Sequence, residues 1–210
     1  QMCIRDRIYI TGSPYDTLLE VIGVNGNGIE SLMEHGVSYK DIALKEGKID
    51  IESVLDGVSE RTKVIAIQRS KGYDQRPSIP LDEIEKVITR LKNVHPNILI
   101  FVDNCYGEFV ERREPIECGA DLIAGSLIKN PGGGLAKIGG YIAGRKDLIE
   151  RCGYRLTAPG IGKEAGASLN ALLEMYQGFF LAPHVVSQSL KGALFTSLFL
   201  EKMNMNTTPK

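Results

Sequence analysis

The chain has 210 residues and a formal net charge of −1, with 43% hydrophobic and 24% charged residues. These values are ordinary for a soluble globular protein of one domain or one and a half. The balanced charge offers no basic surface to nucleic acid, and no apolar run reaches the ~18 residues that a membrane span requires. Its four cysteines are widely separated and fit neither a zinc cluster nor a disulfide framework, so we expect a reducing cytoplasm and no metal.

Short apolar runs alternate with helical patterns in the first half of the chain, as is typical of a parallel sheet with crossover helices. The predicted strands are residues 8–11, 37–44 and 63–68, and the predicted helices begin at Tyr15 or span 49–58 and 80–92. The helix after Tyr15 is expected to bury Leu18, Leu19, Val21 and Ile22. The amphipathic helix 80–92 is expected to bury Leu81, Ile84, Val87, Ile88 and Leu91.

The second half of the chain continues this alternation. The predicted strands are residues 98–103, 121–128 and 139–144, and the first helices after them are 145–151 and 163–180. We expect Pro183 to break the helical pattern, because proline removes a backbone hydrogen bond and crowds the preceding turn. A long helix with an apolar stripe is then predicted over residues 185–203.

Polar side chains follow two of these strands. Asp103 closes one strand, and Lys129 follows the next and opens onto Asn-Pro-Gly-Gly-Gly. In α/β proteins such strand ends deliver side chains to a site. This pair suits pyridoxal phosphate (PLP), because a lysine amine forms a Schiff base with the cofactor aldehyde and an aspartate keeps the pyridine nitrogen protonated. Ser126 is placed to hydrogen-bond the phosphate. The alternative for Lys129 is a lysine of a surface loop.

Four blocks of sequence resemble, in the right order, the fold-type I PLP enzymes of the cystathionine β/γ-lyase group. More narrowly, they resemble the methionine γ-lyase-related branch known for aluminium resistance. The blocks are ITGSPYDT at 10–17, QRSKGY at 68–73, SLIKNPGGG at 126–134 and TAPGIGKE at 157–164. The resemblance implies an α/β fold with a three-layer α/β/α, mostly parallel sheet, which is the large domain of the aspartate aminotransferase-like PLP-dependent transferases.

The resemblance also implies roles for single residues. In similar lyases a tyrosine at the place of Tyr15 stacks on the PLP ring and acts on the leaving group; otherwise Tyr15 would cap a helix against the core. The broader group has an asparagine that bonds the cofactor's phenolic oxygen, and here Arg69 or Ser70 would replace it, unless this loop is solvated. Ile128 stands where a phosphate-binding threonine is usual, so more of that contact would fall to Ser126.

The segment after Asp103 offers further neighbours of the site. Tyr106 is interpreted either as a neighbour of the cofactor ring or as a core residue. Cys105 is interpreted as a small packing residue, because no histidine lies near it in the sequence to form a nucleophilic pair. Glu108 and Glu111 are expected to be solvated.

These inferences predict a PLP-dependent carbon–sulfur lyase that acts on a small amino-acid substrate by β- or γ-elimination. The resemblance, rather than the sequence pattern, supplies a cystathionine- or methionine-type substrate. Three alternatives stay open. The first is another fold-type I reaction, such as amino transfer or aldol cleavage. The second is a PLP-binding protein without turnover, and the third is an inactive fragment of a lyase.

The resemblance covers residues 8 to about 203 and, for that part of the chain, also implies the organisation. Residues 1–7 are set apart as a non-native leader, 8–184 as a partial PLP-binding large domain, and 185–210 as a linker helix toward a small C-terminal domain. Enzymes of this kind share active sites between subunits, so a homodimer or homotetramer is expected. Neither nucleic acid nor a membrane is expected as a partner.

Overall fold

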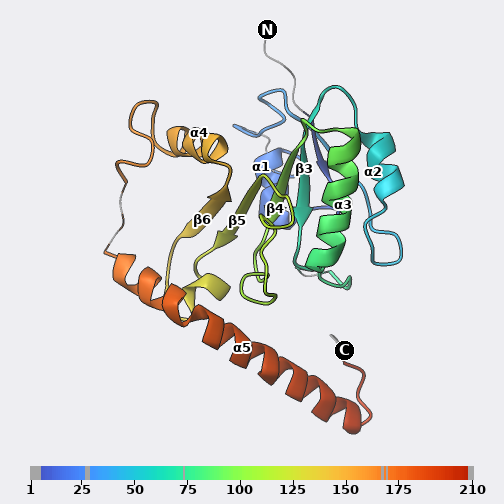
Figure 1. Cartoon of the computed structure of the whole chain (residues 1–210), viewed down its shortest axis with the longest axis vertical. Coiled ribbons are helices and arrows are strands. Elements are labelled where there is room, and N and C mark those ends of the chain that lie inside the picture. Colours follow the sequence, from blue (N-terminus) through green and yellow to red (C-terminus); the bar gives the residue numbers. More distant parts are fainter. Residues whose placement is uncertain (1–5, 27–28, 73, 167, 169, 208–210) are drawn as a thin grey trace. The chain divides into compact units, whose positions relative to one another are not determined.

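The structure, a computed structural model, describes residues 6–26, 29–72, 74–166, 168 and 170–207. Six strands form one sheet in the order β2-β1-β3-β4-β5-β6 (Figure 1). The strands are β1 (Asp6–Tyr9), β2 (Ser38–Asp41), β3 (Thr62–Gln68), β4 (Leu99–Asp103), β5 (Leu122–Ser126) and β6 (Gly140–Gly144). The helices are α1 (Asp16–Ile22), α2 (Ile51–Gly57), α3 (Leu81–Val94), the 3₁₀ turn η1 (Asn130–Gly132), α4 (Lys146–Leu156) and α5 (Leu172–Lys202).

The chain forms two compact units. Unit 1 contains the described residues up to Asn104, together with Pro115–Ala124 and Ala143–Lys146, and unit 2 contains the other described residues. β1 begins at Asp6, inside the segment that the sequence analysis set apart as a leader, and Arg7 pairs with Tyr39 of β2.

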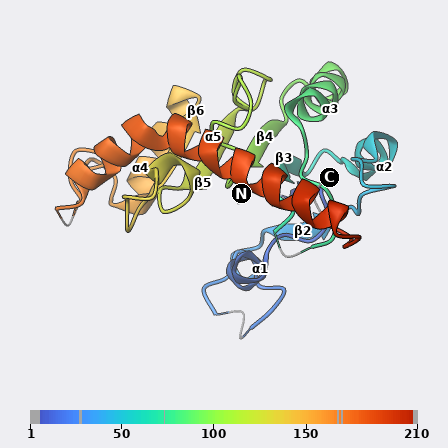
Figure 2. The same cartoon turned by 90° about the horizontal axis from the view of Figure 1, so that it is seen from below.

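Unit 1 has three layers. Its strands β2, β1, β3 and β4 pair in parallel, and β4 pairs in parallel with the start of β5. Tyr9, Ala66 and Phe101 are neighbours in register and face the helix α1, which packs on them through Leu18 and Ile22. Helices α2 and α3 lie on the opposite side of these strands (Figure 2). This arrangement confirms the predicted mostly parallel α/β/α sheet.

The amphipathic pattern of α3 is confirmed in detail, since the structure buries all five residues predicted for its inner side: Leu81, Ile84, Val87, Ile88 and Leu91. The shorter helix α1 follows its pattern less closely. Leu19 and Ile22 are buried as predicted, but Val21 is 56% exposed, so that part of the prediction is wrong. A helix of two turns has too narrow a contact stripe to bury two consecutive residues along with their neighbours one turn away.

A charge cluster around Asp121, which immediately precedes β5, connects it to α3, to β4 and to Arg145. The carboxylate of Asp121 is 2.6 Å from the Lys92 Nζ of α3 and 3.2 Å from Arg145 Nη1, and it accepts a hydrogen bond from the Ile100 N–H of β4. Burial by itself would raise the pKa of Asp121. The hydrogen bonds from Lys92, Ile100 and Arg145 outweigh that effect and hold the pKa below its usual value.

Replacing Asp121 by asparagine is expected to lower the free energy of unfolding by about 2 kcal/mol at neutral pH, because two cations lose a buried counter-charge. The folded pKa lies below the unfolded one, so the aspartate's contribution is complete above the unfolded pKa of about 4. It is lost as the pH falls through the folded pKa. Urea unfolding at several pH values should show the difference between the two chains narrowing in acid. A difference that stays constant from neutral pH into strong acid would contradict this assignment.

Unit 2 is built around α5 and the turn η1, which pack against each other. The predicted break at Pro183 is wrong, because α5 runs from Leu172 to Lys202 with Pro183 inside it. An interior proline costs about 3 kcal/mol, which the hydrogen bonds of a 31-residue helix can offset. Among the described residues no helix, α5 included, is both long and apolar enough to cross a bilayer.

Candidate active site

Unit 1 places Asp103 at the carboxyl end of β4, in register with Gln68 of β3. Because side chains alternate along a strand, Asp103 and Gln68 share the sheet face of Phe101 and Ala66, which is the face that α1 covers. Burial raises the pKa of Tyr9, on the same face, to about 12, with smaller contributions from Tyr39 and Asp103. Tyr9 therefore keeps its proton at neutral pH and is no candidate base.

Gln68 anchors the segment that carries Tyr15. Its side-chain Oε1 accepts a hydrogen bond of 3.1 Å from the Tyr15 N–H, and its own N–H donates to the Thr11 hydroxyl at 3.0 Å. Tyr15 is the residue immediately before α1 and is 46% exposed. The backbone of Tyr15 is thus fixed beside the end of β3, while its phenol remains accessible to a ligand.

Arg69 is buried rather than part of a solvated loop. Its guanidinium donates from Nη1 to the Oδ1 of Asn104 at 2.9 Å, and its N–H donates to the Asp103 carbonyl at 3.0 Å. Arg69 therefore supports the two residues at the end of β4. Tyr73, which closes the same sequence block, lies outside the described residues.

A pocket of about 650 Å³ opens in unit 1 at the carboxyl ends of β1 and β2. Thr11, Gly12 and Ser13 line it, and so does Arg76. Burial lowers the pKa of Arg76, whose guanidinium donates to the carbonyls of Gln68, Ser70 and Pro77. Parallel sheets bind ligands at this edge, and the segment Thr11–Ser13 leads directly to Tyr15.

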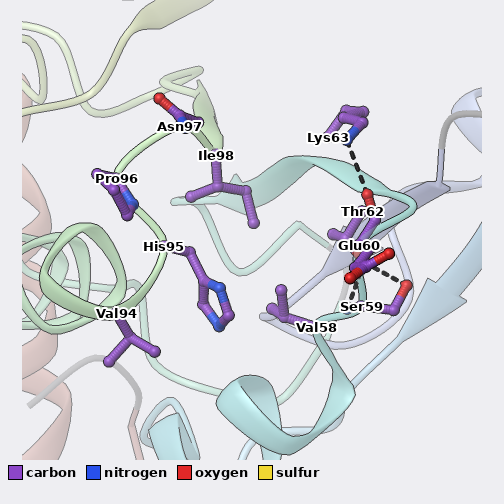
Figure 3. A pocket seen from close by; sticks show the side chains of 10 residues that line it. All are labelled: Val58, Ser59, Glu60, Thr62, Lys63, Val94, His95, Pro96, Asn97 and Ile98. Atoms are coloured by element: carbon purple, nitrogen blue, oxygen red, sulfur yellow. Dashed lines mark hydrogen bonds between the residues drawn. The ribbon is translucent and has the colours of Figure 1, made fainter.

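A second pocket of about 230 Å³ lies at the opposite edge of unit 1, where β3 and β4 begin (Figure 3). His95 and Val58 point into it. Thr62 is the first residue of β3, and Ile98 immediately precedes β4. None of the predicted site residues lines this pocket. Its place at the amino ends of parallel strands argues against a catalytic role.

Unit 2 brings Lys129 and Tyr106 together. Lys129 immediately precedes η1, and its Nζ lies 4.6 Å from the centroid of the Tyr106 ring, within the range of a cation–π interaction. Tyr106 is 58% exposed and has a φ of 65°, a left-handed conformation that side chains rarely adopt. Of the two interpretations offered for Tyr106, this position excludes a core residue.

The loop that carries Lys129 is closed by its own backbone. Lys129 donates its N–H to the Ser126 carbonyl at 3.2 Å, and Ser126 is the last residue of β5. Ile128 is 57% exposed, so the side chain that replaces the usual threonine makes no part of the core. Asn130 donates from Nδ2 to the Glu108 carbonyl at 3.0 Å, which ties this loop to the segment that carries Tyr106.

Glu108 is buried, which corrects the expectation that it is solvated. It is only 4% exposed, and its Oε1 accepts a hydrogen bond of 2.8 Å from the Tyr141 hydroxyl of β6. A Cβ added to Gly125 would overlap this carboxylate and lie 2.5 Å from Tyr141 Cε1, so only glycine fits at that place in β5. No local pattern could have revealed this, since the three residues are distant in the sequence and meet only when the turn that carries Glu108 packs beside β5 and β6.

The fold and the polar strand ends define the class of protein. The pyridoxal-5'-phosphate-dependent protein YhfS of Escherichia coli has the same fold, with a TM-score of 0.60 at 18% identity over 92% of this chain and 47% of that chain. This is the fold-type I architecture of PLP-dependent enzymes. Residues 4–210 match the sequence model of the methionine gamma-lyase family, and the chain belongs to that family.

Other proteins are more similar to this chain than YhfS is. The uncharacterized protein YnbB of Bacillus subtilis is 60% identical over 97% of this chain and 49% of its own length. A crystal structure from Listeria monocytogenes, described as a candidate cystathionine beta-lyase involved in aluminum resistance, has a TM-score of 0.95 at 54% identity. The alignment covers 98% of this chain and 51% of that one. The chain thus spans about half the length of these relatives.

Proposed function

We propose that the protein is a PLP-dependent carbon–sulfur lyase that acts on a sulfur amino acid by β- or γ-elimination. The observation that carries the proposal is the position of Lys129, which lies three residues after the end of β5 and whose ammonium lies over an exposed tyrosine ring. Membership of the methionine gamma-lyase family supports the lyase class, and the Listeria protein's description supports a cystathionine-type substrate.

The residues present fit this cofactor by their chemistry. PLP carries an aldehyde, a phosphate and a pyridine nitrogen, and when bound it supplies an electron sink for a substrate carbanion. Unit 2 offers an amine at Lys129, a hydroxyl at Ser126 and an aromatic face at Tyr106. Unit 1 offers a carboxylate at Asp103 and an accessible phenol at Tyr15.

Each residue then has a defined task in the proposed reaction. Lys129 Nζ would hold the cofactor through its aldehyde and would take the proton from the substrate Cα. Asp103 would keep a proton on the pyridine nitrogen, and the cofactor would then stabilise negative charge that develops at Cα. Tyr15 would contact the cofactor ring and would donate a proton to the departing sulfur.

The remaining positions bind rather than react. Ser126 would bind the phosphate, with no hydroxyl at Ile128 to assist it. We propose that Arg69 contributes to cofactor binding by holding Asn104 and Asp103 in place through its hydrogen bonds to them. We further propose a homodimer or homotetramer in the cytoplasm, in which a second subunit completes the site.

The test is to trap the cofactor and locate it. The purified chain is mixed with PLP, reduced with borohydride and digested, and the modified lysine is identified by mass spectrometry. Reduction is expected to fix PLP at Lys129 together with the loss of a visible absorbance band. Pyridoxamine phosphate, which lacks the aldehyde, is the matched control and should leave no adduct.

A portion of the PLP-loaded chain that has not been reduced is then assayed with cystathionine, methionine and cysteine for release of a thiol, or of sulfide from cysteine, and of a 2-oxo acid. Capture of PLP at other lysines in proportion to their exposure would refute the assignment of Lys129. Capture at Lys129 with exchange of amino groups between substrates, and no thiol release, would replace the lyase by an aminotransferase.

A further inference from the structure

Helix α5 contains a glycine that lies directly against the turn carrying Lys129. A Cβ added to Gly178 would overlap the carbonyl oxygen of Gly132 and lie 2.7 Å from its carbonyl carbon. The approach is reciprocal, since a Cβ on Gly133 would lie 3.1 Å from the Gly178 carbonyl carbon. The backbones of α5 and η1 are thus in contact at a point where no side chain fits.

Phe179, the next residue of α5, contacts the segment that carries Tyr106. The Phe179 ring packs edge-on against Phe109, with ring centroids 5.5 Å apart. Phe109 follows Glu108, whose carbonyl accepts the hydrogen bond from Asn130 beside Lys129. Two consecutive residues of α5 therefore contact both segments that meet around the Lys129 ammonium, the turn η1 and the segment that carries Tyr106.

A glycine inside a helix lowers its stability relative to alanine and calls for a structural reason. Gly178 has one in the contact with Gly132. Gly192, which lies in the same helix, has open space around it, with no heavy atom within 4 Å of an added Cβ. The two glycines of α5 are thus matched in secondary structure and differ in this contact.

We infer that Gly178 is a positioning residue for Lys129. Because Gly178 has no side chain, η1 can pack directly on the backbone of α5, and this contact sets the position of the lysine amine. The inference rests on the proposed function, in which that amine binds the cofactor. It assigns to α5 a part in the active site, although none of the proposed catalytic or cofactor-binding residues lies on this helix.

The test compares Gly178→Ala with Gly192→Ala. Both substitutions give α5 the same gain in helix propensity, so the contact with η1 is what separates them. In the cofactor-free chain, the rate of reductive methylation of Lys129 is measured by mass spectrometry, with Lys191 as internal reference. With PLP added, its dissociation constant and the pH midpoint of the visible band are measured.

Gly178→Ala is expected to weaken PLP capture at Lys129 by about a hundredfold, as for a reacting group displaced by ~1 Å, and to change both the methylation rate and the pH midpoint. Gly192→Ala should match the unaltered chain in all three. Equal behaviour of the two variants would overturn the inference. Failure of the unaltered chain to bind PLP at Lys129 would refute the proposed function instead, and the methylation rates would still decide whether Gly178 positions the lysine.

Circular dichroism shows whether Gly178→Ala folds. If it does not, Phe179→Ala tests the same junction without adding atoms to it. Removal of this ring should loosen α5 from Phe109 and reduce PLP capture by about tenfold. An unchanged capture by a folded Phe179→Ala chain would contradict the inference.

Discussion

Lys129→Ala is expected to lower the proposed carbon–sulfur lyase activity by about 10⁴-fold or more, because the variant would lose both the proposed attachment to the cofactor and the proposed base. Stability should change little. The Lys129 ammonium lies over the exposed ring of Tyr106, and such a contact contributes about 0.5 kcal/mol. Thiol release from cystathionine measures the activity, and urea unfolding shows that the variant remains folded.

Lys137→Ala is the matched control for this substitution. Lys137 lies in the same unit, its side chain is 79% exposed, and it pairs with Glu174 at 2.9 Å. Loss of an exposed ion pair of this kind changes stability by less than ~1 kcal/mol and should leave the activity intact. If Lys137→Ala and Lys129→Ala were equally active, the lyase chemistry would not depend on Lys129.

Asp103→Asn should reduce kcat by about 10²- to 10³-fold while PLP is still captured at Lys129. Asparagine keeps the size of the side chain, and the backbone bond from Arg69 to the carbonyl of residue 103 is unaffected. What is lost is the negative charge that would hold a proton on the pyridine nitrogen. Steady-state kinetics and borohydride trapping, carried out on one preparation, separate the two effects.

Asp56→Asn serves as the control for Asp103→Asn, because Asp56 is an exposed residue of α2 with no proposed role. It should retain the full rate. A full rate for Asp103→Asn as well would show that the proposed catalytic carboxylate lies elsewhere. A loss of PLP capture would instead point to a binding role for Asp103.

The strands and α3 can be predicted from the sequence because their burial is a local property. An apolar run of strand length is typical of a strand covered by helices on both faces. Apolar residues at helical spacing face a single layer, and α3 shows this with all five residues. The course of α5 through Pro183 could not be predicted in the same way. The proline rule describes one turn of helix, whereas the outcome depends on the many hydrogen bonds on either side.

In the candidate site, too, some features follow from local sequence and others from contacts between distant residues. Asp103 and Ser126 are the last residues of their strands, and Lys129 lies three residues after Ser126. Hydrophobic patterning locates the end of β4 at Asp103, but it extends β5 to residue 128, two residues beyond its end at Ser126. The surroundings of Lys129 depend instead on contacts between residues distant in the sequence, as between Glu108 and Tyr141. From the sequence, Glu108 beside Gly107 is expected to be solvated, whereas in the structure it is buried and accepts a hydrogen bond from the Tyr141 hydroxyl of β6.

The left-handed backbone of Tyr106 and Phe109 has a consequence for attempts to engineer the protein. At φ values of 65° and 61°, each of these residues costs on the order of 1 kcal/mol that glycine would not. At Tyr106, whose ring is exposed, selection for heat resistance alone would favour glycine, whereas at Phe109 the packing of the ring on Phe179 offsets the strain. Glycine at Tyr106 would remove the ring beneath the lysine, and the resulting chain would be more stable but would lose a contact of the proposed site. Libraries built on this protein should keep the two aromatic residues fixed and look for stability elsewhere.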